Sequence, residues 1–239
     1  MLPEDALDRL VDGSNEIANL CRKNKVQQWE IVAMQSYGHQ LDIEAGKISL
    51  AAGGGDGGYG IRVVEDGKFG YAHLVDLKSA DKAIQQAMSI ARISPSIKGF
   101  TLPSNQDAGE VKGLFDKKIL SIGPEDLLEQ ADSILNEVSS LDKRAVVTGG
   151  GLGVSATAGI LTSSEGIDHH GITTSHGLGV QVSIDENDQL TSSWQGESSK
   201  KLIEVIPNCV AKSVEWAQKT RDPIKAVSYT HLTLPTKRI

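Results

Sequence analysis

Apolar side chains recur at helical spacing in four separate stretches of the chain. The first begins at Pro3 and the second ends at Pro95, while the third and fourth begin at Pro124 and Pro207. Proline suits the first turn of a helix, because the amide hydrogen that it lacks would have no partner there. Each stretch gathers its apolar residues on one stripe, so the pattern predicts four amphipathic helices.

Between these helices the apolar period changes to two, which indicates β-strands. Residues 29–37 carry apolar side chains on both faces, which predicts a central strand that is covered on both sides. Turn residues at 44–46 and 65–68 predict two hairpins. Further strands are expected at 145–148, 154–162, 171–184 and 189–194. The fold class is therefore α+β, with mixed or antiparallel sheets, flanking helices and a β-rich section after the third helix.

A boundary between two sections is predicted near residue 98. Residues 94–118 are rich in proline, glycine and polar residues and show no clear periodicity. We expect an N-terminal α/β domain at 1–98, made of a helix, a strand meander and a helix, and a middle α+β section at 99–222. Residues 227–239 resemble a translated sequencing-adapter tail, so we predict that residues 223–239 are not native.

Composition narrows the classes of partner. The formal net charge is −7, aromatic residues make up 4% of the chain, and no window concentrates lysine and arginine. These features argue against direct binding of nucleic acid or an anionic membrane. Two distant cysteines, no signal-peptide pattern and no long apolar stretch predict a cytoplasmic protein with reduced thiols.

The glycine-rich run at 53–60 contains the GxGxxG spacing of dinucleotide-binding loops twice. That fingerprint needs a strand before it and a helix after it, but here a strand follows. We therefore interpret the run as a flexible connector between strands rather than as a nucleotide site. The second glycine cluster, at 149–153, also leads into a strand and lacks the residues that complete a P-loop.

Asp168, His169, His170 and His176 form a cluster whose side chains could in principle bind zinc. Neighbouring side chains on a strand point to opposite faces, so His169 and His170 cannot easily share one ion. Surface or loop histidines are the favoured interpretation, and a metal site of Asp168, His169 and His176 is the alternative. The serines and threonines between 155 and 199 accompany no GxSxG motif, so a solvent-facing sheet explains them better than a nucleophile.

Arg62 follows the glycines directly, between two apolar residues. A salt bridge at a sheet edge explains it better than contact with a substrate. Gly58, Tyr59, Gly60 and Arg62 are nevertheless the candidates for a surface that faces a substrate or a partner.

The order of these motifs resembles the N-terminal region of the TldD/PmbA (TldD/TldE) family. The resemblance rests on residues 58–64, 66–72, 99–103 and 114–116, together with the helices that end near Pro95 and begin at Pro124. It spans about residues 5–222. Members of this family are often labelled modulators of DNA gyrase, and the family is regarded as a cytosolic metallopeptidase system. This sequence departs from the family pattern at one single position, where Ser163 replaces the asparagine that the family often has.

The second departure concerns the mechanism. The catalytic TldD-type subunit is expected to carry HExxxH in a later domain, but none of the six histidines here is followed by glutamate. The resemblance therefore implies no catalytic and no metal-binding residue in this chain, with zinc in a TldD-type partner or in a missing C-terminal domain. It favours the metal-free PmbA/TldE-type subunit, which supplies scaffold and surface for a partner and an unfolded peptide. The resemblance also implies truncation, because the family's C-terminal domain would begin near Lys219.

Two other hypotheses stay open at this point. The chain could be a free-standing, non-catalytic binding or assembly module. It could also be a small enzyme that uses the histidine cluster or the glycine run for a metal or a nucleotide. The sequence leaves open whether the chain itself belongs to an active enzyme.

Overall fold

The computed structural model describes residues 3–105, 109, 111–187, 189–202 and 206–221. The non-native tail predicted at 223–239 lies outside these residues. The helices are α1 (Pro3–Lys23), α2 (Ala80–Ile93), α3 (Pro124–Leu141) and α4 (Ile206–Lys219), with short 3-10 helices η1 (Leu77–Ser79) and η2 (Lys117–Ser121). The strands are β1 (Gln28–Glu44), β2 (Lys47–Glu65), β3 (Lys68–Leu74), β4 (Ala145–Ser163), β5 (Asp168–Glu186) and β6 (Gln189–Ser199).

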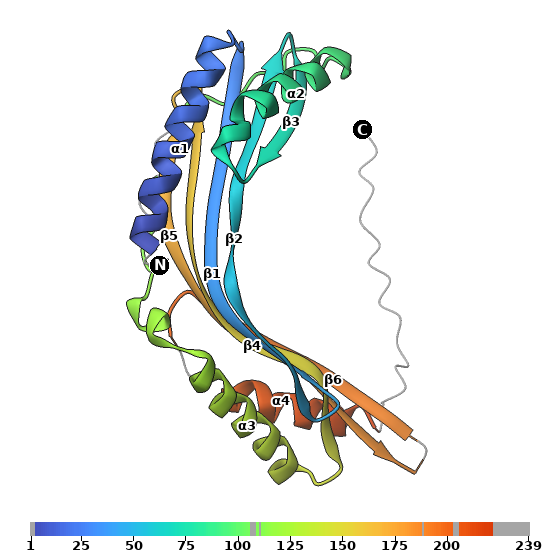
Figure 1. Ribbon diagram of the computed structural model, residues 1–239. Helices are drawn as coiled ribbons and strands as arrows, with labels where there is room; N and C mark the ends of the chain where they lie inside the picture. Colours follow the sequence, from blue (N-terminus) through green and yellow to red (C-terminus); the bar gives the residue numbers. More distant parts are fainter. Residues whose placement is uncertain (1–2, 106–108, 110, 188, 203–205, 222–239) are drawn as a thin grey trace, which may run out of the picture.

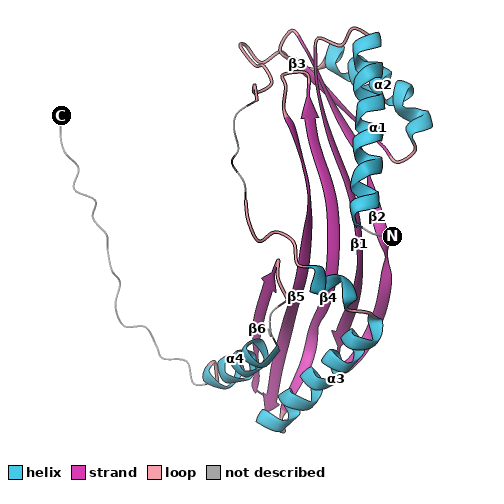
Figure 2. Ribbon diagram, turned by 90° about the vertical axis from the view of Figure 1, so that its left-hand side faces the viewer, coloured by secondary structure: helices cyan, strands magenta, loops and turns pink. Residues whose placement is uncertain are grey.

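One curved antiparallel sheet, in the order β3-β2-β1-β4-β5-β6, carries all six strands. Figure 1 shows this sheet bending along the length of its strands, with α1 beside the upper part and α3 and α4 below the lower part. In Figure 2, α1 and α3 both lie in front of the strands, on the convex side of the sheet. The α+β prediction is confirmed, and the sheet is antiparallel throughout.

Two hydrophobic cores lie on the same face of the sheet. Along β1, the odd-numbered residues face the helices, so Ile31 and Ala33 pack in the upper core while Leu41 and Ile43 pack in the lower core. The upper core joins this face to α1 and α2, and the lower core joins it to α3 and α4. The division into sections 1–98 and 99–222 stays a prediction, but β1 and β4 contribute residues to both cores.

A β-bulge in β4 keeps the apolar residues of that strand on the helix-covered face. The register against β5 shifts between Val147 and Gly149. Before the shift the odd-numbered residues Ala145 and Val147 are buried, and after it the even-numbered residues Leu152 and Val154 are buried. An extra residue in one strand changes the face on which the following side chains lie.

Helix α2 lies unusually close to β3. A Cβ atom built on Gly70 would come within 2.0 Å of the carbonyl oxygen of Ala87 and within 2.7 Å of the amide nitrogen of Ala91. Because both neighbours are helix backbone, only glycine allows this approach. The contact fixes the helix against the β2–β3 hairpin.

Three expectations about the strands need correction. The glycine run at 53–60 is not a connector but the middle of β2, paired with residues 32–39 of β1. Strand β1 is central, as predicted, but one of its faces is open, since Val32 is 43% and Met34 is 51% exposed. Arg62 does form a salt bridge, at 2.7 Å to Glu30, but inside the sheet rather than at its edge.

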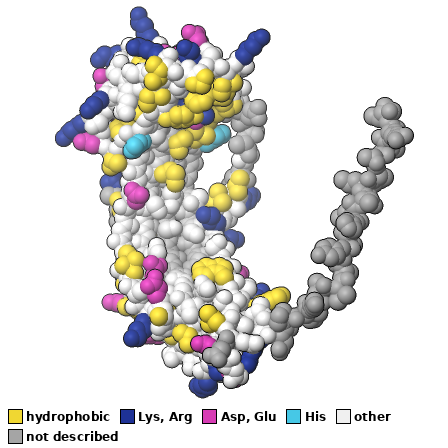
Figure 3. Space-filling model, turned by 90° about the vertical axis from the view of Figure 1, so that its right-hand side faces the viewer, with side chains coloured by type: hydrophobic (Ala, Val, Ile, Leu, Met, Phe, Trp, Pro, Cys, Tyr) yellow, Lys and Arg dark blue, Asp and Glu magenta, His cyan; other side chains and the backbone are white. Residues whose placement is uncertain are grey.

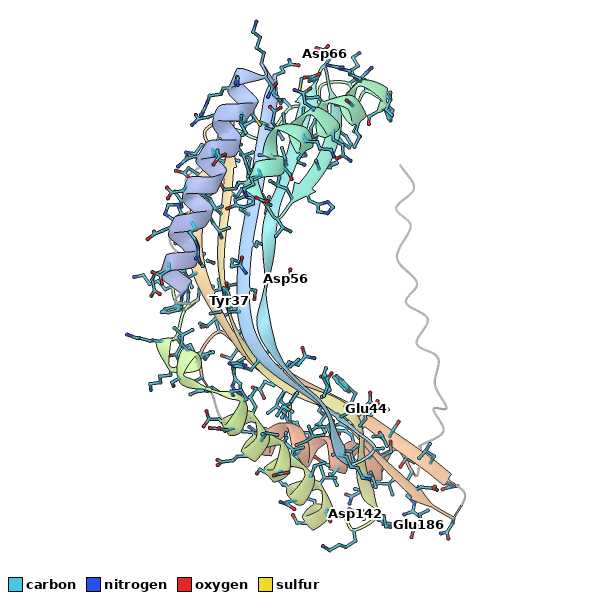
Figure 4. All side chains as sticks on the ribbon, viewed as in Figure 1. Tyr37, Glu44, Asp56, Asp66, Asp142 and Glu186 are labelled. Atoms are coloured by element: carbon cyan, nitrogen blue, oxygen red, sulfur yellow. The ribbon has the colours of Figure 1, made fainter. Side chains whose placement is uncertain are left out.

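The four predicted helices are confirmed, and the last of them turns Val210, Val214 and Ala217 inward as expected. At the lower end of the sheet, Asp142 follows α3 and binds Arg144, which also pairs with Glu186 (Figure 4). None of the described helices is long and apolar enough to cross a membrane.

Candidate functional site

The concave face of the sheet carries few large side chains over its middle section. Residues that alternate with the core positions point to this side, and many are glycine, serine or threonine. Figure 3 shows the concave face, where the middle is mostly white while hydrophobic side chains gather at the upper end. Small residues on the inner face allow the strands to bend sharply and leave the backbone accessible to a ligand.

A hollow of about 780 Å³ lies in the lower part of this face. We call it the concave trough. It has the size of a site for a small molecule or a short peptide segment, but it is open on one side. Its floor is lined by Gly150, Gly151, Gly153, Gly177, Gly179 and Gly196, with Gln40, Asp42, Ser155, Ser175, Trp194 and Ser198 among the side chains around them.

Trp194 forms one wall of the trough. Its indole ring lies over Gly179 of the neighbouring strand, where a Cβ atom would come within 2.5 Å of the ring. The ring nitrogen also lies close to Gly196. Although Trp194 rests on two strands, it is 58% exposed, so a flat aromatic surface faces the trough.

Asp42 forms the opposite wall. Its carboxylate Oδ1 accepts a hydrogen bond of 2.7 Å from the side-chain amide of Gln40. The same oxygen leans over Gly151 of β4, within 2.9 Å of the position that a Cβ would take. Asp42 places a carboxylate on the trough side of the sheet, and no described lysine or arginine lines the trough, so the charge at this wall is negative. Glu197 also borders the trough, but it pairs with the core residue Leu178, so its side chain lies on the helix-covered face.

A second hollow, of about 360 Å³, adjoins the trough and shares Gln40 and Ser155 with it. Its lining adds Asp56 of β2, which points to the concave side of the sheet in Figure 4, opposite to Tyr37. Each of the two hollows therefore has one carboxylate on the concave face, Asp42 in the trough and Asp56 in the adjoining hollow.

The predicted partner-facing residues divide between the two faces of the sheet. Gly58, Gly60 and Arg62 lie on the concave face, where they pair with Met34, Val32 and Glu30 of β1. Tyr59 lies on the other face, is 8% exposed, and donates a hydrogen bond of 3.3 Å to the carbonyl oxygen of Arg9 in α1. Tyr59 is thus a core residue under α1.

Arg62 lies between two partners on the concave face. It forms its ion pair with Glu30 on one neighbouring strand, and Tyr71 lies opposite it on the other. Desolvation works against the charged guanidinium, but bonds to Tyr71 and Glu30 outweigh it and raise the pKa of Arg62. Val32, Met34 and Tyr71, each 43–52% exposed, lie on the same face as this pair, and we call these three residues the upper apolar patch.

The residues of the alternative metal site do not lie together. Asp168 and His169 begin β5, and His176 lies eight positions further along the strand, which corresponds to about 26 Å. The described part of the chain contains no group of three or more His, Cys, Asp or Glu residues that could hold a metal ion. The residues present therefore do not fit a zinc site.

His176 is buried rather than on the surface, at 3% exposure, whereas His169 and His170 are exposed as expected. Neither ring nitrogen of His176 has a hydrogen-bond partner among the described residues. Burial disfavours the charged imidazolium and lowers the pKa of His176. The imidazole is therefore neutral in the folded protein.

We expect His176 to make folding stability depend on pH. The unfolded chain takes up a proton near pH 6.5, whereas the folded chain resists it until a lower pH. The free energy of unfolding should thus be highest above about pH 6.5 and decrease as the pH falls. For one proton the decrease is at most about 1.4 kcal/mol per pH unit. Urea denaturation of the wild type and His176→Leu at several pH values between about 5 and 7.5 measures this, since the leucine variant should show a flatter profile.

His169→Leu provides the control, because it makes the same replacement at an exposed histidine of the same strand. Equal slopes for the wild type and His176→Leu would show that His176 is not the group responsible.

Part of the chain matches the sequence model of a known protein family. Residues 29–91, which run from the start of β1 to the end of α2, match the model of the PmbA/TldA metallopeptidase domain 1. Residues 29–91 therefore form a domain of the TldD/PmbA family. The match covers the β1–β3 part of the sheet, including the upper apolar patch.

Individual relatives extend the similarity beyond that domain. The chain is 26% identical over 200 residues to the uncharacterized protein MJ0231 of Methanocaldococcus jannaschii, covering 84% of this chain and 45% of that protein. The crystal structure of TldE from Thermococcus kodakarensis shares the fold with a TM-score of 0.74 at 21% identity, covering 85% of this chain and 47% of that one.

A proposed modulator of DNA gyrase from Bacteroides thetaiotaomicron matches with a TM-score of 0.78 at 18% identity, over 89% of this chain and 50% of that one. The likeness to these two structures shows the fold alone. The chain spans about half the length of the relatives that it matches.

The sequence pattern places Trp194 only at the end of a strand and does not single out Asp42. One signal in the sequence could have identified the tryptophan. It is a large aromatic residue within a strand whose other residues are almost all polar or small, which is unusual for a side chain that packs in a core. Nothing in the sequence places Asp42 beside it, because the two lie on strands that are not neighbours.

Proposed function

We propose that this chain is the PmbA/TldE-type subunit of a cytoplasmic two-subunit metallopeptidase that degrades unfolded peptides. In this assembly the chain supplies the scaffold and part of the surface that binds a TldD-type partner and the peptide. The observation that carries the proposal is the domain 1 match, whose strands belong to a sheet with an open concave face.

The sheet offers two kinds of surface for this role. The upper apolar patch, with Gly58, Gly60 and Arg62 beside it, is suited to a protein partner because exposed apolar side chains surround a paired charge. Strands β3 and β6 lie at the two edges of the sheet, where an extended peptide can add by main-chain hydrogen bonds.

The zinc of the proposed enzyme is not held by the described residues, which provide no ligand set for it. We expect it to be bound by the TldD-type partner or by a C-terminal domain. The part of the chain described here therefore contributes binding and positioning, and no catalytic residue.

Reconstitution with a TldD-type subunit tests the proposal. Hydrolysis of an unfolded reporter peptide should appear only when both chains are present and should be abolished by a metal chelator. Met34→Asp should weaken association, because it places a charge in the upper apolar patch, whereas Ile93→Asp should not, since Ile93 is 86% exposed on α2. Chelator-sensitive hydrolysis by this chain alone, or a partner activity that its addition leaves unchanged, would refute the proposal.

A further inference from the structure

The concave trough places an aromatic ring and a carboxylate over two paired glycines. Gly151 of β4 and Gly179 of β5 are direct partners in the sheet. The carboxylate of Asp42 leans over Gly151, and the indole of Trp194 lies over Gly179. Paired residues on neighbouring strands are about 5 Å apart, so the two groups face each other across one strand spacing.

We propose that this pair binds the guanidinium group of an arginine side chain in an extended peptide. A guanidinium is planar, stacks on an aromatic face, and forms hydrogen bonds with a carboxylate. Such a group fits between a ring and a carboxylate that lie over adjacent glycines. The proposal rests on the proposed function, because it names the kind of peptide that the concave face binds.

The charges around the trough support a cationic ligand. Asp42 faces the trough and Asp56 faces the adjoining hollow, and no described lysine or arginine lines either of them. An arginine entering the trough would therefore meet negative charge without a competing side chain of its own sign.

The glycine floor determines how the ligand can approach. Without Cβ atoms at Gly151, Gly153, Gly177 and Gly179, a peptide main chain can lie close to the strands while its side chain reaches Trp194. The ring is held by contact with Gly179 and Gly196, so little freedom is lost when the ligand binds.

Binding of matched peptides tests the proposal. One short, unstructured, glycine- and serine-rich peptide carries a central arginine, and the other carries citrulline, which has the same shape but no charge. Fluorescence anisotropy of a label on each peptide gives its Kd for the 239-residue chain. The arginine peptide should bind about tenfold more tightly than the citrulline peptide, and its advantage should decrease at high salt.

Three variants locate the binding. Trp194→Leu and Asp42→Asn should each weaken binding of the arginine peptide by about three- to thirtyfold and leave the citrulline peptide almost unaffected. Trp216→Leu is the matched control, because Trp216 is a similarly exposed tryptophan on α4 outside the trough. Thermal denaturation of each variant establishes that its fold is unchanged.

Equal affinity for the two peptides, or unchanged affinity in Trp194→Leu, would overturn the arginine site. Both results would leave the proposed function intact, since that is judged by hydrolysis in the presence of a TldD-type partner. If neither peptide binds, the arginine site is also wrong, and the hydrolysis assay then decides separately whether the chain serves the peptidase.

Discussion

Replacing Gly70 by alanine should destabilise the protein by about 3 kcal/mol, at the upper end of the range for overpacked cores. The added methyl group would overlap the carbonyl oxygen of Ala87 and the amide nitrogen of Ala91. Helix backbone cannot rotate away as a flexible side chain does, so α2 would have to move off β3. Urea denaturation measures the loss as a lower midpoint.

Gly54→Ala is the control for this experiment. Gly54 also lies in a strand, but a Cβ atom there would meet nothing within 4 Å. Alanine should be neutral or slightly stabilising, because it restricts the unfolded chain more than glycine does. Equal losses at the two positions would mean that the effect of Gly70 comes from strand propensity and not from contact with α2.

Gly150→Ala should cost about 2–4 kcal/mol, since it combines backbone strain with a steric overlap. Gly150 has φ +145, a conformation that residues with a side chain rarely adopt, and its Cβ would come within 2.3 Å of the carbonyl oxygen of Gly179. The residue follows the bulge of β4, so alanine there should also disturb the floor of the concave trough. The free energy of unfolding measures the loss.

The neighbouring residue supplies the control. At Gly149 no positive φ is required, and the nearest atom to an added Cβ is the side-chain oxygen of Gln181, at 3.8 Å. Gly149→Ala should therefore change the unfolding free energy by less than about 1 kcal/mol. A loss at Gly149 as large as that at Gly150 would contradict the importance of the backbone conformation after the bulge.

The helices could be predicted from the sequence because their signals are local. The early proline and the acidic residues at the start of α3, with Leu127, Ala131 and Ile134 on one stripe, are enough to identify it. The signals for the two hairpin turns are also local. Gly46 and Gly67 lie in these turns, and both have the positive φ that the turns require.

The middle of β2 could not be predicted in the same way. Glycine has low strand propensity, so residues 53–58 carry no local sign of a strand. They are extended because they pair with β1, which in turn pairs with β4 far away in the sequence. The open face of β1 was missed for a related reason. Val32 and Met34 look like core residues in the sequence, and only the arrangement of the helices shows that nothing in the described chain covers them.

The candidate site depends on the same long-range pairing. Asp42 and Trp194 come from β1 and β6, and they approach each other only because β4 and β5 lie between them with glycines at the paired positions. Arg62 could be predicted as half of an ion pair because its apolar neighbours place it on a strand, but its partner Glu30 could not be identified without the register.

The seam between β1 and β4 has a consequence for how the chain reaches its folded state. It joins residues more than a hundred positions apart, and it runs the length of the sheet. Closing so long a loop is slow compared with forming helices or hairpins. During synthesis, the backbone N–H and C=O groups on one edge of β1 should therefore stay unpaired until β4 has been made. In that interval the nascent chain should be most prone to aggregation.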